Sequence, residues 1–194
     1  VALCCALAIE LIPINKWFIG AMGAIVILLL YIVSKKWFSI DHPHNRTSWG
    51  IFYFGLSYFL LLIFWGEKSP VTVVLAMAVM GLADAMAALV GRSFPIPALK
   101  LGNEDKSWAG SSTFFMISSI LLFGALHLLN WLNYPSSMMV LFGFVLWLTL
   151  IENSSANGSD NLSVPLVFGV LFPFLFGPLS RIEVANRFLE ILPF

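Results

Sequence analysis

The sequence is poor in charge. Only 10% of its 194 residues are charged, and ten basic side chains balance ten acidic ones. Soluble domains carry about 25% charged residues, so the composition excludes an ordinary soluble domain. The longest polar interval, residues 92–110, also leaves no room for a separate one. A formal net charge of zero argues against a nucleic-acid partner.

Cysteine and histidine are scarce as well. Cys4 and Cys5 are adjacent within an apolar run, so they form no disulfide framework and we expect them simply to pack. His42 and His44 have the spacing of some metal sites, but the third histidine, His127, belongs to a different segment. A histidine or cysteine metal site is therefore disfavoured.

Apolar residues are abundant, at 60% of the chain, and the mean hydropathy is +0.94. They gather in seven segments of roughly the length that spans a bilayer, namely residues 1–14, 17–34, 49–65, 71–91, 112–131, 136–151 and 162–179. The first is short, and we interpret it as the tail of a membrane helix rather than a signal peptide, because no charged region precedes it. The sequence thus predicts an all-α, polytopic integral membrane bundle of about six to seven transmembrane helices, forming a single domain over residues 1–194.

The basic residues are distributed unevenly between the connections. The connections after the second and fourth segments hold Lys35, Lys36, Arg46, Arg92, Lys100 and Lys106. The opposite side holds only Lys16 and Lys68 in its short connections, with Arg181 and Arg187 after the last segment. The positive-inside rule therefore predicts that the basic connections face the cytoplasm. By parity, Asp160 and the end of the helix that carries Asp84 converge on the same membrane face.

Asp84 is an acid inside the apolar segment 71–91. Burial in apolar surroundings disfavours a charged carboxylate unless a cation or metal compensates it, and acids inside membranes are usually functional. Gly81, Ala88 and Gly91 recur with Asp84 at three- and four-residue spacing, which predicts a face that another helix or a ligand can approach closely. The alternative is a structural pairing of Asp84 with Arg92.

Two polar elements frame later segments. Residues 106–112 (KSWAGSS) place a lysine and several small residues at a helix start, where free N–H groups favour anions. The alternative is an ordinary helix start with Ser111 or Ser112 as N-cap. Asp160 and Asn161 precede the last segment, where they either cap the helix, with Pro165 in its first turn, or ligate magnesium.

Further side chains could add to such a site. Glu152 and Asn153, at the other end of the loop before Asp160, offer more oxygen ligands. Arg46 is a candidate anion contact, although it could equally be a plain basic residue of a cytoplasmic loop.

Taken together, these residues resemble the CTP-dependent polyprenol kinase family, which includes dolichol kinase, phytol kinase and the CTP-using diacylglycerol kinases. The family's G-D-x-x-A-x-x-x-G segment is similar to residues 81–92 (GLADAMAALVGR), its K-S-x-E-G-S element to 106–111 (KSWAGS), and its D-N-L-[ST]-[IV]-P element to 160–165 (DNLSVP). An arginine and a glycine before an aromatic helix also match, as Arg46 and Gly50. The chain departs from the family in three respects. Leu82 and Ala83 separate the glycine from Asp84, and Ala109 replaces the glutamate. The Arg-Lys…His helix with which family members usually start is not found, which we expect to reflect a missing N-terminus.

The resemblance implies an enzyme that transfers the γ-phosphoryl group of CTP to the hydroxyl of an isoprenoid alcohol or diacylglycerol in the bilayer. It implies Asp84, Lys106 and Asp160 as catalytic residues, with Asp84 and Asp160 holding Mg²⁺. The implied nucleotide- and phosphate-binding residues are Arg46, Arg92, Ser107, Gly110, Ser111 and Asn161. Two alternatives remain open: an enzyme like the phosphatidate cytidylyltransferases, whose K-D-x-x-x-P-G signature we do not find, and a non-catalytic membrane protein or transporter with Asp84 as an ion site.

Overall fold

The computed structural model describes residues 16–34, 49–94, 106–128 and 135–177. The elements bounded in these ranges are all helices: α2 (Lys16–Ser34), α3 (Gly50–Trp65), α4 (Pro70–Ala78), the π-helix η1 (Val79–Ala83), α5 (Asp84–Ser93), α6 (Trp108–Leu128), α7 (Pro135–Ser154) and α8 (Asp160–Phe176). The all-α prediction is confirmed. The segment 1–14, the cysteines, the pair His42 and His44, and Arg46 lie outside the described residues.

Three of the helical stretches are long and apolar enough to cross a membrane, namely Pro70–Ser93, Trp108–Leu128 and Ser136–Ser154. The first of these is α4, η1 and α5 joined into one continuous span. Shorter apolar helices cover Gly20–Ile32, Gly50–Trp65 and Asp160–Phe176. Since a span needs about 20 apolar residues, the described chain has the character of a membrane helical bundle, as the sequence predicts.

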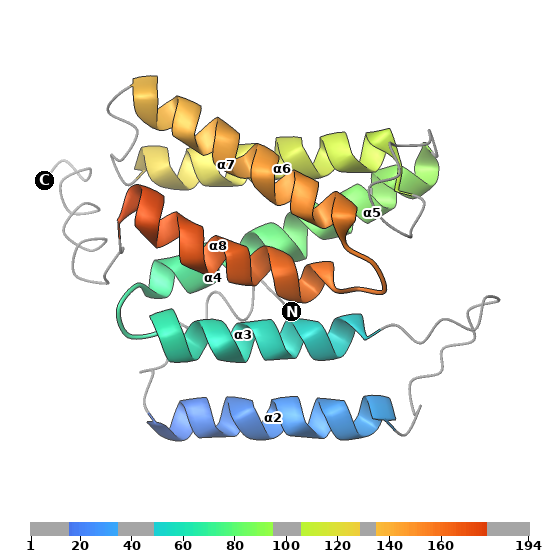
Figure 1. The fold of residues 1–194 in the computed structure, drawn as a ribbon, viewed down its shortest axis with the longest axis vertical. Coiled ribbons are helices and arrows are strands. Elements are labelled where there is room, and N and C mark those ends of the chain that lie inside the picture. The colour runs from blue at the N-terminus through green and yellow to red at the C-terminus, as the bar shows by residue number, and fades with distance from the viewer. Residues whose placement is uncertain (1–15, 35–48, 95–105, 129–134, 178–194) are drawn as a thin grey trace, which may run out of the picture.

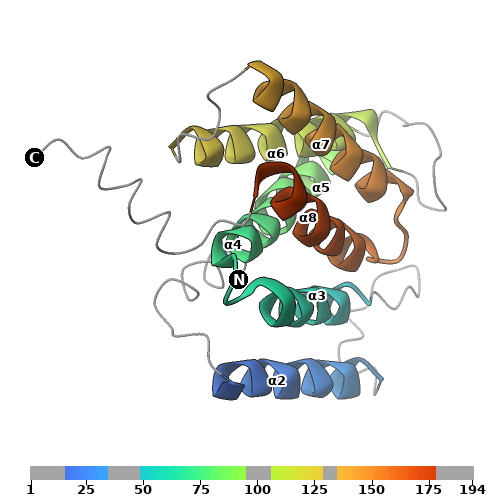
Figure 2. The same ribbon diagram turned by 60° about the vertical axis from the view of Figure 1, so that its left-hand side comes forward.

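The helices lie in layers (Figures 1 and 2). At one edge α2 packs on α3, and α3 packs in turn on α8 and α4. On the other side of α8 lies α7, while α6 packs on α5, η1 and α7. This order places α4 and η1 inside the bundle, where they contact α3, α6 and α8, while α5 packs on α6 and has an exposed face.

The interior is filled by large apolar side chains, and the outer faces are apolar too. Phe144 of α7 packs edge-on against Phe168 of α8, with ring centroids 5.3 Å apart, and Phe172 stacks on Phe168 at 4.9 Å. Outside, Phe174 is 84% exposed and Met139 77%. Such exposed side chains are costly in water but suit contact with lipid tails, which agrees with the membrane prediction.

The helix ends that border the most polar connections lie at one end of the bundle, which we call its polar end. In Figure 1, α2, α5 and α7 end on the right, and α3, α6 and α8 begin there. The convergence that the alternating connections predict is therefore present among the described helices. The assignment of this end to the cytoplasm stays a prediction.

Two helix starts differ from the expected ones. Helix α6 begins at Trp108, and the Ser107 hydroxyl accepts a hydrogen bond from the Gly110 N–H at 3.0 Å, which is the N-cap geometry. The expectation of a cap at Ser111 or Ser112 is therefore wrong by one turn, because Ser107 performs this role. Helix α8 begins at Asp160, so Pro165 lies in its second turn rather than its first.

Candidate active site

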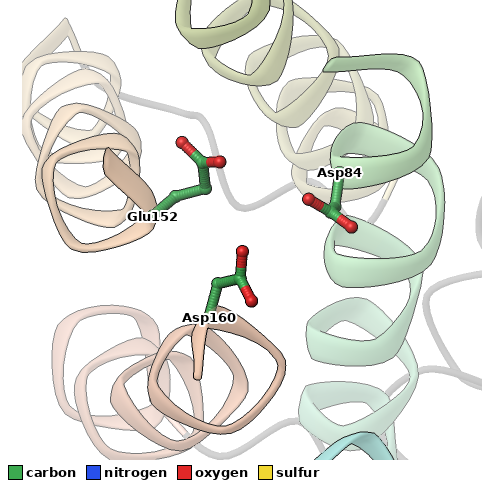
Figure 3. A group of neighbouring side chains, drawn as sticks. All are labelled: Asp84, Glu152 and Asp160. Atoms are coloured by element: carbon green, nitrogen blue, oxygen red, sulfur yellow. The ribbon is translucent and has the colours of Figure 1, made fainter. Parts of the chain in front are cut away.

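Three carboxylates meet at the polar end of the bundle. Asp84 begins α5, Glu152 lies near the end of α7 and Asp160 begins α8. One oxygen of each lies within 4.8 Å of an oxygen of the other two. Figure 3 shows the three side chains pointing toward one another from three different helices. We call Asp84, Glu152 and Asp160 the carboxylate cluster.

Asp84 is presented by an irregular stretch of helix. The π-helix η1 packs against α6 and α4 and ends directly before Asp84. A π-helix is wider than an α-helix and often occurs next to functional sites, because it redirects the residues that follow. Asp84 is half-buried, at the border between the packed side of α5, which carries Ala87, and the exposed side, which carries Ala85 and Ala88.

A tight loop brings Glu152 and Asp160 together. Helix α7 ends at Ser154 and α8 begins at Asp160. In between, Asn157 and Gly158 have positive φ angles of 54° and 78°, a conformation that asparagine and glycine tolerate best. The loop is short because these two residues reverse the chain within one turn.

Lys106 joins the carboxylate cluster from the residue before the Ser107 cap. Its ammonium donates hydrogen bonds to Glu152 Oε1 and, at 3.2 Å, to Asp160 Oδ2. Burial alone would lower the pKa of Lys106, but the negative charges of Glu152 and Asp160 outweigh burial and raise this pKa above its ordinary value. Lys106 is therefore protonated at neutral pH.

The start of α6 is held against α5 by two glycines. A Cβ on Gly91 would lie 2.8 Å from Ser107 Oγ, and a Cβ on Gly110 would lie 3.1 Å from the Ala87 carbonyl oxygen. Only glycine fits such a crossing without displacing a neighbour. The contact fixes the backbone next to Lys106 relative to the helix that carries Asp84.

A polar contact joins α6 to α7 at the same level. The Ser111 hydroxyl lies 2.5 Å from Asn153 Oδ1 and 3.1 Å from the Ser107 carbonyl oxygen, both of which can accept its proton. Asn153 follows Glu152, so this contact sets the position of the α7 end that carries the acid.

The structure brings some of the expected site residues together and leaves others apart. Asp84, Lys106 and Asp160 meet in one cluster, and Asn161 follows Asp160 in the first turn of α8. Ser107 caps α6 beside this cluster, and Gly110 and Ser111 lie in the first turn of the helix. Arg92 is exposed, and its guanidinium bonds the Ala88 carbonyl at 3.0 Å. In the described chain no carboxylate pairs with Arg92, so the alternative of an Asp84–Arg92 pair is not seen.

Glu152 was expected only as an additional oxygen ligand, yet it is the most buried acid of the group, at 4% exposure. A signal for its larger role was present, since an acid at the edge of an apolar segment needs a compensating cation. The sequence could not say that this cation is Lys106, 46 residues earlier.

The donor set of the carboxylate cluster suits a hard divalent cation. Mg²⁺ prefers oxygen ligands in near-octahedral geometry, where opposite ligands are about 4.2 Å apart. The oxygens of Asp84, Glu152 and Asp160 lie within 4.8 Å of one another, whereas neighbouring ligands of Mg²⁺ lie about 3 Å apart, so the carboxylates would have to rotate closer together to hold the ion. With all three ionised, they carry three negative charges against the single positive charge of Lys106.

The chain is similar to a protein from Oryza sativa subsp. japonica named probable phytol kinase 1, chloroplastic, with 32% identity over 124 residues. This homology confirms the predicted resemblance to the polyprenol kinase family. The aligned part covers 60% of this chain but 38% of the relative, so the chain spans well under half of that protein's length. No family model matches the chain, and no solved structure matches it significantly.

The residues that carry the resemblance lie close together in the structure. The three elements that resemble those of the polyprenol kinases, at residues 81–92, 106–111 and 160–165, lie far apart in the sequence. Each contributes one charged side chain, Asp84, Lys106 or Asp160, to a single group. Such an arrangement can bind a cation and an anion side by side.

Proposed function

We propose that this protein is a membrane-embedded lipid-alcohol kinase that transfers the γ-phosphoryl group of CTP to the hydroxyl of an isoprenoid alcohol or diacylglycerol. The observation that carries the proposal is the meeting of Asp84, Lys106 and Asp160, one from each family element, at the polar end of an apolar bundle. The similarity to a phytol kinase supports the choice of a lipid alcohol as acceptor.

The charged residues divide between metal and phosphate. Asp84 and Asp160, with Glu152 beside them, would hold Mg²⁺, which would neutralise charge on the phosphate oxygens. Lys106 supplies a positive charge to the same phosphates, at the start of α6 where the helix dipole also favours an anion. Arg92, Asn161 and Arg46, which lies outside the described residues, are further candidates for contacts with the nucleotide.

The transfer step needs little covalent chemistry from the protein. The acceptor oxygen attacks the γ-phosphorus, the bond from that phosphorus to the β–γ bridging oxygen breaks, and CDP leaves with the bond electrons. The hydroxyl proton passes to a carboxylate of the cluster. The residues of the chain chiefly position the two substrates and offset charge, as is general in phosphoryl transfer.

The lipid alcohol reaches this centre from the side. The exposed face of α5, which includes Ala85, Ala88 and Leu89, adjoins Asp84 within a membrane span. Small side chains there let a lipid chain approach the helix closely. The hydroxyl would then lie at the level of Asp84 while the tail stays among apolar side chains. The bias of the basic connections assigns the nucleotide to the cytoplasmic side.

A product assay tests the proposal. The detergent-solubilised protein is incubated with Mg²⁺, γ-labelled CTP and, separately, phytol, a polyprenol or diacylglycerol. Label in one lipid would establish the kinase and identify its acceptor. Label released as pyrophosphate, only when phosphatidate is present, would instead indicate a cytidylyltransferase-like enzyme. Absence of product from every acceptor would favour the transporter alternative.

A further inference from the structure

Lys106 bonds two of the three carboxylates that the proposed function assigns to a metal ion. Its ammonium bonds Glu152 Oε1 and Asp160 Oδ2, and these two carboxylates belong to the cluster that suits Mg²⁺. The three side chains are 19%, 6% and 14% exposed, so little solvent screens the contact. Lys106 thus already provides a positive charge next to the carboxylate cluster.

A metal ion and this ammonium would compete for the same oxygens. Mg²⁺ binds oxygen at about 2.0–2.1 Å and requires near-ideal geometry. A cation that close to both Glu152 Oε1 and Asp160 Oδ2 would overlap with Lys106 Nζ, which donates to the same two atoms. The two positive charges would also repel each other. The metal can therefore bind these two oxygen atoms only after the ammonium has moved.

The lysine side chain can move while its backbone stays in place. The cap at Ser107 and the crossing of Gly91 with Gly110 fix the chain next to Lys106. The four-carbon stem of lysine is flexible and carries a compact charge. If it leaves the carboxylates, the ammonium needs a new anionic partner, and a nucleotide phosphate bound beside the metal would provide one.

We propose that Lys106 is an exchangeable counter-cation that shields the carboxylate cluster from metal alone and transfers to a phosphate oxygen when nucleotide and metal bind together. This inference rests on the proposed function and deepens it. The exchange makes metal and nucleotide binding cooperative, because the metal replaces Lys106 at the carboxylates and the nucleotide phosphate gives Lys106 a new partner. It also leaves one positive charge in contact with Glu152 and Asp160 between turnovers.

The test measures metal binding rather than activity. Binding of Mn²⁺, a spectroscopic substitute for Mg²⁺, is followed by electron paramagnetic resonance on the solubilised protein, with and without CTP, against a blank of CTP alone. The variants are Lys106→Met, which keeps the length of the side chain and removes its charge, and Lys106→Arg, which keeps the charge. Lys68→Met is the matched control, since Lys68 is exposed in the connection between α3 and α4.

We expect wild type and Lys68→Met to bind Mn²⁺ weakly alone and about tenfold or more tightly with CTP, a normal size for coupling between two ligands. Lys106→Met should bind Mn²⁺ alone about tenfold more tightly than wild type and lose most of the effect of CTP. Equal Mn²⁺ affinity of Lys106→Met and wild type without CTP would overturn the exchange and leave Lys106 a structural tie. If Lys106→Met does not fold, an equal Mn²⁺ affinity of the wild type with and without CTP would overturn the exchange.

A second pair of variants separates this inference from the proposed function. Glu152→Gln and Asp160→Asn remove charge from the proposed metal ligands. If both bind Mn²⁺ as wild type does, the metal site itself fails, and the proposed function loses its main support. If both bind more weakly while Lys106→Met is unchanged, the metal site stands and only the exchange fails.

Discussion

Gly91 of α5 and Gly110 of α6 face each other where the two helices cross, with the Ser107 hydroxyl beside both. The Cβ that alanine would add at Gly110 would lie 3.5 Å from Gly91 Cα and 3.1 Å from the Ala87 carbonyl oxygen. The two glycines lie in two of the elements that carry the resemblance, 81–92 and 106–111. Their contact sets α5, which begins with Asp84, against the start of α6, which Lys106 precedes by two residues, and so places both side chains at a common centre.

Gly110→Ala should therefore weaken both the fold and the site. The Ala87 carbonyl is backbone and cannot rotate away, so the helices must separate, and overpacking of this kind costs about 1–3 kcal/mol. Thermal unfolding in detergent measures the stability, and the product assay measures turnover. Gly124→Ala is the matched control, because a Cβ there, on the same helix, meets nothing within 4 Å. A variant Gly110→Ala with wild-type stability would contradict the tight crossing.

The contact between Ser111 and Asn153 should carry measurable coupling. Ser111 is buried, and its hydroxyl lies 2.5 Å from Asn153 Oδ1, on a different helix. A double-mutant cycle with Ser111→Ala and Asn153→Ala should give a coupling free energy of about 0.5–1.5 kcal/mol, as for a net hydrogen bond. Ser112 is the exposed neighbour of Ser111, so Ser112→Ala should show no coupling free energy with Asn153→Ala. Coupling near zero for Ser111 would mean that the two side chains act independently.

Much of the fold could be predicted from the sequence, because the bilayer imposes simple rules. Apolar runs of the right length become spanning helices, and the described helices fall on six of the expected segments. The alternation of the connections between the two sides also predicted that Asp160 and the Asp84 end of its helix lie at the same face of the bundle. These features depend on composition and chain direction, both of which a sequence displays.

The pairing within the site could not be predicted in the same way. That Lys106 bonds Glu152 depends on how α6 and α7 pack, which the periodicity of either helix does not specify. The early start of α6 depends on the Ser107 cap, since KSWAGSS offers three serines and the sequence does not rank them. The π-helix before Asp84 likewise has no signature among apolar residues. Side-chain partners between helices therefore required the structure.

Asp84→Asn should abolish turnover without preventing folding. The amide has the same size and keeps a coordinating oxygen, but it removes the charge that the proposed metal and proton transfer need. We expect the rate in the product assay to fall at least about 100-fold, as on loss of a major electrostatic contribution. Glu67→Gln, at an exposed acid between α3 and α4, should have the wild-type rate. Retained turnover in Asp84→Asn would exclude a catalytic role for this acid.

Removal of divalent metal should destabilise the nucleotide-bound protein as well as stop turnover. A ligand that binds only the folded state adds about 2.7 kcal/mol of stability at one hundred times its dissociation constant. With CTP present, chelation by EDTA should therefore lower the melting temperature, and added Mg²⁺ should restore it. Without CTP, EDTA should change the melting temperature little, because the Lys106 ammonium already forms ion pairs with the carboxylates of Glu152 and Asp160. In Glu152→Gln the shift with CTP should shrink, since one of the three carboxylates is lost. A melting temperature that EDTA leaves unchanged in the presence of CTP would show that the cluster holds no metal in the nucleotide complex.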